Sequence, residues 1–185
     1  NERGPAFSHD GRYLYFSSDR AEGQGGDDIY VARWDGRAWT GVEALGTTIN
    51  SPARETGPAP TADGKRLYFS SNRAGGNDIF VSQRIEEAPL VVSEPDREQA
   101  PGANNEKASI QPENPLPNWS LPPLPRFSNA ETADHLNSSA EDLQTALTRR
   151  GDHVFFASDR DRSNETGFGV YFSRVIDGEA LPPER

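Results

Sequence analysis

The stretch that decides the fold is residues 2–33, which read ERGPAFSHDGRYLYFSSDRAEGQGGDDIYVAR. The same pattern returns at residues 55–84 as ETGPAPTADGKRLYFSSNRAGGNDIFVSQR. Phe69 stands in the second copy where Phe16 stands in the first, 53 residues further along the chain. Self-similarity at a period of about 50 residues is the signature of propellers and related repeat architectures.

A third and more divergent copy lies near the C-terminus. Residues 149–174 read RRGDHVFFASDRDRSNETGFGVYFSR, which places Gly151 at the position of Gly11. The segment that leads into a copy repeats as well, because residues 136–142 (LNSSAED) match residues 49–55 (INSPARE). The sequence therefore predicts three copies of one structural unit.

Each copy carries two short runs rich in aromatic and branched side chains, as strands require. The first run lies at residues 13–16, 66–69 and 153–156, and the second at residues 29–31, 79–81 and 170–172. Gly11 and Gly64 supply the positive φ for a tight hairpin before the first run. With a strand before this hairpin and an outer strand at residues 39–45, each copy forms a four-stranded antiparallel propeller blade.

The second and third copies are separated by an insertion. Glu55 and Asp142, at matching positions, are 87 residues apart instead of 53. A match of Trp119 to Trp39 places the inserted sequence at about residues 86–118, which are rich in Pro, Asn, Glu and Ser. Such a composition has too little apolar periodicity to pack by itself. We expect either a flexible surface loop or an arm that lies along a partner.

The predicted fold class is all-β, namely a partial β-propeller of about three four-stranded antiparallel blades with a Pro-rich insertion. Residues 1–185 form a single domain, with blade 1 at about 2–46, blade 2 at about 47–125 and blade 3 at about 136–185. Closed propellers use about 4 to 8 blades. We therefore expect either a piece of a larger propeller or an open arc held by another protein.

The elements GPAFSHDGRYLYFSSDR, GGDDIYVAR and INSPARE resemble the TolB-type, WD-repeat-like propeller repeat. The resemblance covers residues 2–84 well and residues 119–178 moderately. Repeats of this type occur in bacterial envelope proteins, including some that are joined to OmpA-like domains. The resemblance implies a propeller fold and a periplasmic or extracellular location, and it is specific for the fold rather than for a function.

The composition excludes several classes of function. The chain has 19 Lys and Arg against 29 Asp and Glu, a formal net charge of −10 that disfavours binding to nucleic acid. No apolar run approaches the roughly 18 to 20 residues that cross a bilayer, so we expect no direct membrane insertion. The absence of Cys excludes disulfides and thiolate chemistry.

We predict no catalytic residue, no metal site and no cofactor. The three histidines, His9, His135 and His153, stand in no spacing typical of a nucleophile or of a set of metal ligands. The loop at residues 159–165 has oxygen-bearing side chains but lacks the Gly and the Glu of an EF-hand.

Three acidic residues, Glu2, Glu55 and Asp142, share one position just before the first strand of a copy. In a propeller this position lines the central channel, where convergent charge forms an acidic ring that binds a cation or a basic peptide. The alternative is that each carboxylate accepts backbone N–H bonds within its own loop.

The other repeated charged residues are expected to serve the blade itself. They are Asp10, Asp63, Arg20, Arg73, Arg160, Asp28 and Asp78. The arginines follow the second strand and the last two aspartates precede the third. We therefore expect ion pairs across the hairpin end or turn caps.

The predicted function is a non-catalytic β-propeller module for protein binding or scaffolding. It would be an accessory or structural subunit, or a segment, of a larger bacterial extracytoplasmic assembly. Its partners would be other protein subunits, including those of a membrane-associated complex. The alternative is a propeller segment of a hydrolase or lyase whose catalytic residues lie outside this chain. A ligand or cation sensor that uses the acidic channel is a third hypothesis.

Overall fold

The computed structural model describes residues 1–85, 121–148, 150–161, 167–177 and 179–184. Over these residues the chain is all-β, with three antiparallel sheets and no helix, so the predicted fold class is confirmed. The strands are β1 (Glu2–Phe7), β2 (Tyr13–Ser18), β3 (Asp28–Trp34), β4 (Trp39–Ala44), β5 (Glu55–Pro60), β6 (Arg66–Ser71), β7 (Asp78–Ile85), β8 (Arg126–Phe127), β9 (Glu131–Thr132), β10 (Asp142–Leu147), β11 (His153–Ser158), β12 (Gly169–Ile176) and β13 (Glu179–Ala180).

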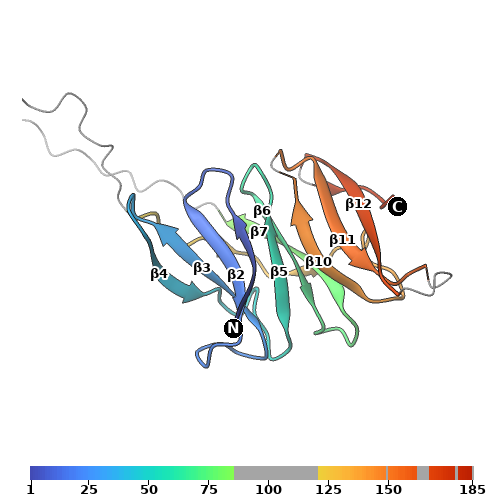
Figure 1. Ribbon diagram of the computed structural model, residues 1–185, viewed down its shortest axis with the longest axis horizontal. Coiled ribbons are helices and arrows are strands. Elements are labelled where there is room, and N and C mark those ends of the chain that lie inside the picture. Colours follow the sequence, from blue (N-terminus) through green and yellow to red (C-terminus); the bar gives the residue numbers. More distant parts are fainter. Residues whose placement is uncertain (86–120, 149, 162–166, 178, 185) are drawn as a thin grey trace, which may run out of the picture.

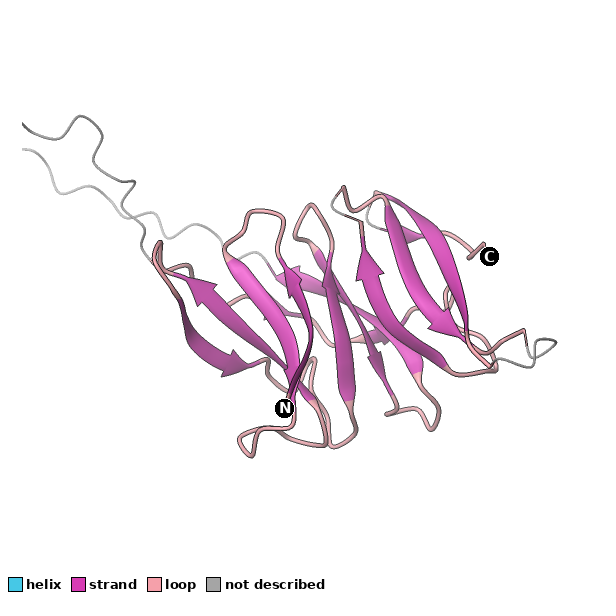
Figure 2. Ribbon diagram, in the orientation of Figure 1, coloured by secondary structure: helices cyan, strands magenta, loops and turns pink. Residues whose placement is uncertain are grey.

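Each sheet is one blade. Blade 1 has the order β1-β2-β3-β4, blade 2 has the order β5-β6-β7-β8 with β9 also paired to β7, and blade 3 has the order β10-β11-β12-β13. Figure 1 shows the three blades side by side, with β4 towards one end and β12 towards the other. Figure 2 shows the same arrangement as strands joined by short loops. The result is an open arc of three blades.

The blades are held together by two hydrophobic cores. One core joins blades 1 and 2 through side chains such as Tyr15, Ile29 and Phe69. The other joins blades 2 and 3 through side chains such as Ile79 and Phe156. Because each central strand carries apolar side chains on both faces, a blade buries one face only when a neighbour stacks on it.

The innermost strands β1, β5 and β10 approach one another closely at a β-bulge that recurs in each blade. Gly4, Gly57 and Gln144 share this position and have φ values of 55°, 60° and 51°. A Cβ atom on Gly57 would lie 3.2 Å from the Cα atom of Gln144. Glycine is therefore favoured at Gly57 both by the positive φ and by the close approach of the next blade.

The outer strand of blade 2 differs from the sequence prediction. Phe127 pairs with Arg84 as Trp39 pairs with Trp34, so Phe127, rather than Trp119, holds the position of Trp39. Trp119 and the expected insertion at 86–118 lie outside the described residues. Phe127 is buried in the core between blades 1 and 2. Sheet pairing in blade 2 therefore continues to β9, past the expected boundary near residue 125.

The chain just before β8 lies against blade 1. The hydroxyl of Tyr13 donates a hydrogen bond of 2.9 Å to the carbonyl of Pro123. Nη1 of Arg33 donates to the carbonyl of Pro122 at 3.4 Å. The end of the segment that links β7 to β8 is thus packed on the neighbouring blade.

Candidate binding groove

The lead-in to each later blade holds the third strand of the blade before it. In blade 2 this lead-in contributes Asn50, which is 1% exposed. Its Oδ1 accepts the N–H of Ile29 at 2.8 Å, and its Nδ2 donates to the carbonyl of Ile29 at 3.0 Å. Asn137 binds Ile79 in the same way, at 2.7 and 2.8 Å. We call these two contacts the asparagine clamps.

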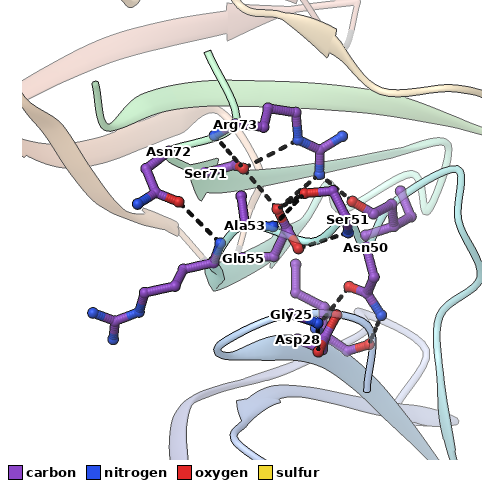
Figure 3. A network of polar contacts seen from close by, with 12 residues as sticks. Gly25, Asp28, Asn50, Ser51, Ala53, Glu55, Ser71, Asn72 and Arg73 are labelled. Carbon is purple, nitrogen blue, oxygen red and sulfur yellow. Dashed lines mark hydrogen bonds and ion pairs between the residues drawn. The ribbon is translucent and has the colours of Figure 1, made fainter. Parts of the chain in front are cut away.

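A buried knot of polar groups follows each clamp (Figure 3). Glu55 is fully buried and accepts bonds from the N–H of Ser51 at 2.9 Å and from the hydroxyls of Ser51 and Ser71 at 2.7 Å. Arg73 pairs with Glu55 at 3.1 Å, and its guanidinium also lies over the rings of Phe69 and Phe80. The carboxylate is thus surrounded by donors, which a buried charge requires.

The same knot recurs in the other two blades. Arg160 pairs with the fully buried Asp142 at 2.7 Å, and Arg20 pairs with Glu2 at 3.0 Å. Each arginine also stacks on two aromatic rings of its own blade. In blade 1 the pair is exposed. An exposed pair of this kind contributes about 0 to 1 kcal/mol.

These contacts differ from the expected pairing of the arginines with Asp28 and Asp78. Asp28 instead accepts bonds from the backbone N–H groups of Gln24 and Gly25, at 2.9 and 3.1 Å. The arginines turn away because their guanidinium groups stack on the aromatic rings and reach the lead-in carboxylate. Burial, followed by the negative charges of Asp142 and Glu141, raises the pKa of Asp78 above its usual value.

Asp10 and Asp63 cap the hairpin turns between the first two strands of their blades. Asp10 accepts a bond from the N–H of Arg12 at 3.0 Å, and Asp63 accepts one from the N–H of Lys65 at 3.0 Å. Burial opposes the shift, yet the bonds from Thr61 and Lys65 lower the pKa of Asp63 below its usual value. Both residues therefore hold turns.

The expected acidic ring takes a different form in the structure. Glu55 and Asp142 are fully buried within their knots, whereas Glu2 is exposed and paired with Arg20. Glu55 and Asp142 accept backbone N–H bonds from Ser51 and Ser138, at 2.9 and 2.8 Å. This is the geometry of the alternative, in which each carboxylate stabilises its own loop.

A groove of about 1040 Å³ runs along the innermost strands of the three blades. Its walls are mostly small or proline side chains from β1, β5 and β10, including Pro5, Pro58 and Ala146. Arg3 and Arg54 also line it, and His9 lies at its edge among the lining residues. None of the three acidic residues of the expected ring is among the lining residues.

Arg3 and Arg54 converge on one buried carboxylate beneath the groove. Asp27, which is 3% exposed, accepts bonds from Nη1 of Arg3 at 2.6 and 2.8 Å. It also accepts from Nε of Arg54 at 3.1 Å and from Nη2 of Arg54. The equivalent contact between blades 2 and 3 joins Asn77 to Glu141. At matching positions, the interface between blades 1 and 2 thus has two arginines around an aspartate, and the interface between blades 2 and 3 has a glutamate bonded to an asparagine.

Sequence reasoning missed Arg3, Asp27 and Arg54 as a group. These residues stand at positions where the copies of the repeat differ, because Asn77 matches Asp27 and Glu141 matches Arg54. A comparison that looks only for residues shared between copies passes over such positions.

Groups able to hold a metal ion, with three or more His, Asp or Glu side chains, are absent from the part of the chain that the structure describes. The loop at 162–166 lies outside that part. His153 lies 3.2 Å from Asp152 on a hairpin of blade 3, away from the groove lining. Among the described residues, no helix is long and apolar enough to span a membrane.

Comparison with solved structures places the chain in the class of TolB-like β-propellers by fold. TolB from Acinetobacter baumannii matches at a TM-score of 0.50 and 16% identity, covering 97% of this chain and 32% of that one. A putative TolB from Agrobacterium tumefaciens matches at a TM-score of 0.55 and 19% identity, covering 100% of this chain and 48% of that one. At these identities the likeness establishes the fold alone.

The chain spans less than half the length of either of these two proteins. A prolyl endopeptidase also matches, at a TM-score of 0.46 and 15% identity, covering 98% of this chain and 21% of that one. That similarity is too low to carry an argument. No protein-family model matches the chain, and no curated protein matches its sequence.

Proposed function

We propose that the chain is a non-catalytic β-propeller module that binds other proteins and acts as a scaffold in a larger bacterial extracytoplasmic assembly. The observation that carries the proposal is an uncovered apolar face on blade 3. Val170 is 68% exposed, whereas Ile29 and Ile79, at the matching positions, are fully buried. Phe155 is 39% exposed, and its counterpart Tyr68 is 3% exposed.

In this proposal the occupant of the face is a further blade of the same repeat that another protein subunit carries. Each of the two internal interfaces covers the matching face with the next blade and places an asparagine clamp on it. The TolB structures that share the fold are more than twice as long as this chain, which fits additional blades. Exposed apolar patches rimmed by polar groups mark interaction sites.

The polar groups repeated between blades support a non-catalytic role. Asn50 holds Ile29 of the preceding blade, and Glu55 and Arg73 hold the lead-in against their own blade. Groups that serve structure in this way are not free to act on a substrate. The TolB-like fold supports the extracytoplasmic location, and the alternative of a hydrolase segment has no comparable observation in its favour.

The experiment is site-specific photo-crosslinking in cells that make the full protein. A benzophenone amino acid replaces Val170, and a matched control places it at the exposed hairpin residue Arg37 of blade 1. We expect Val170 to cross-link to a propeller segment that contains an Asn-Ser lead-in, and Arg37 to give no such product. If the chain is folded and the benzophenone at position 170 forms no such cross-link, the proposal is refuted.

A further inference from the structure

The charge of the groove runs against that of the whole chain. The protein carries a formal net charge of −10. Among the described residues that line the groove, however, the charged side chains are Arg3 and Arg54, and none is Asp or Glu. A concave site with one sign of charge concentrates ligands of the opposite sign.

The two arginines are only half neutralised. Both bind the single carboxylate of Asp27, so the group of three carries a net charge of +1. The side chains of Arg3 and Arg54 are 49% and 57% exposed, whereas that of Asp27 is 3% exposed. Arg54 uses Nε and Nη2 for Asp27, and Arg3 uses Nη1, which leaves Nη1 of Arg54 and Nη2 of Arg3 to face a ligand.

The structure holds Arg54 in place before any ligand arrives. Its backbone N–H donates to Oδ1 of Asn72 at 2.9 Å. Its aliphatic stem lies against Gly26, where a Cβ atom would stand 2.6 Å from Cγ of Arg54. A guanidinium that is already oriented loses little entropy when it binds a carboxylate.

The arrangement is not demanded by the fold. At the interface between blades 2 and 3, Thr56 and Asn77 replace Arg3 and Asp27, and Glu141 replaces Arg54. At these three positions the interface between blades 2 and 3 carries no cation. The positive charge between blades 1 and 2 therefore calls for a reason other than packing.

We propose that Arg3 and Arg54 form a binding site for a carboxylate group in the groove. This inference rests on the proposed function, because an acidic segment of a partner protein is one source of the carboxylate, and a small dicarboxylic acid is the other. Guanidinium groups bind carboxylates through two parallel charge-assisted hydrogen bonds. The Pro and Ala side chains in the walls leave room for an extended chain.

The test measures binding of a fluorescein-labelled decapeptide of alternating Glu and Ala to the full chain by fluorescence anisotropy. A decapeptide of alternating Gln and Ala is the neutral control, and succinate is the competitor. The variants are Arg3→Gln and Arg54→Gln, with Arg37→Gln as a matched control that removes an exposed arginine elsewhere on blade 1.

We expect each groove variant to weaken binding of the Glu peptide about fivefold or more. Arg37→Gln should leave it unchanged. Asp27→Asn should strengthen binding, because it removes the internal carboxylate that competes for both arginines. A purely structural role for these three residues predicts the opposite, since Asp27→Asn would then loosen the site and weaken any binding.

The outcomes separate this inference from the proposed function. Displacement of the Glu peptide by millimolar succinate assigns the site to small acids, and its absence assigns it to a peptide. Equal binding of the Glu and Gln peptides, or no effect of either groove variant, overturns the carboxylate site. If the chain cross-links through Val170 but binds neither the Glu peptide nor succinate, the proposed function stands and the carboxylate site is refuted.

Discussion

Asn50 and Ile29 lie in different blades, yet the side-chain amide of Asn50 bonds both the N–H and the carbonyl of Ile29. A third bond joins Nδ2 of Asn50 to the carbonyl of Leu45 at 2.5 Å, and the N–H of Leu45 donates to the carbonyl of Ile29 at 2.9 Å. The side chain of Asn50 and the backbone of Leu45 together take the place of a neighbouring strand at this point. The clamp explains why the lead-in sequence repeats along with the blades.

Replacing Asn50 with Ala should destabilise the protein by about 1 to 3 kcal/mol, because it leaves the buried N–H of Ile29 without its partner. Urea unfolding measures the change. Asn137→Ala is the matched control, and its cost should be smaller because Asn137 is partly exposed. Equal and small costs at both positions would contradict the clamp.

Glu55→Gln tests the role of the buried knot. The substitution removes the charge that faces Arg73 and places an amide among donors from Ser51 and Ser71. Breaking a buried pair costs about 3 kcal/mol. The same change at the exposed Glu2 should cost under about 0.5 kcal/mol. Thermal and urea unfolding of both variants give the comparison, and similar values for the two would refute the assignment.

The pH dependence of stability should have opposite signs at Asp78 and Asp63. The raised pKa of Asp78 means that its ionised form is disfavoured in the folded state, so stability is lost as pH rises above the unfolded pKa. The lowered pKa of Asp63 means that stability is lost as pH falls below the unfolded pKa.

Asp78→Asn should therefore stabilise the protein at pH 7, and Asp63→Asn should destabilise it. The Asp78 difference should fade as pH falls below the unfolded pKa of about 3.9. The Asp63 difference should shrink below the same pH and disappear only as pH falls through its lowered folded pKa. Urea unfolding between pH 3 and pH 7, in steps, follows both effects. Differences that are independent of pH would mean that charge is not their cause.

Gly57→Ala should cost more than Gly11→Ala. Both glycines have positive φ, at 60° and 68°, which costs an L residue about 1 kcal/mol. A Cβ on Gly57 also meets the backbone of Gln144 and Thr145 at 3.2 Å, whereas one on Gly11 meets nothing within 4 Å. The additional cost of overpacking is about 1 to 3 kcal/mol. Calorimetric melting of the two variants would show whether the inner strands are in contact.

The repeat made the blade predictable, because residues such as Phe16 and Phe69 recur at a fixed spacing and serve one purpose in each copy. The partner of each arginine was not predictable in the same way. Arg73 is near Asp78 in sequence, but its guanidinium stacks on Phe80 and pairs with Glu55. The pairing of β5 with β6, which sets Glu55 opposite Ser71, brings these groups together.

The outer strand and the groove were missed for two further reasons. Phe127 holds the position in blade 2 that Trp39 holds in blade 1. Because either aromatic residue can stand there, a search for a second Trp placed the outer strand of blade 2 at Trp119 instead. Arg3 and Arg54 meet Asp27 from different blades. A contact that occurs at only one interface leaves no repeat in the sequence.

Amide hydrogen exchange at Ile29, Ile79 and Val170 tests the stacking of blades most directly, because the three residues hold the same place in successive blades. The account predicts slow exchange at Ile29 and Ile79, whose N–H groups bind Asn50 and Asn137, and fast exchange at Val170 on the open face. Asn50→Ala should speed exchange at Ile29 alone. Fast exchange at all three amides in the unmodified chain would contradict the account.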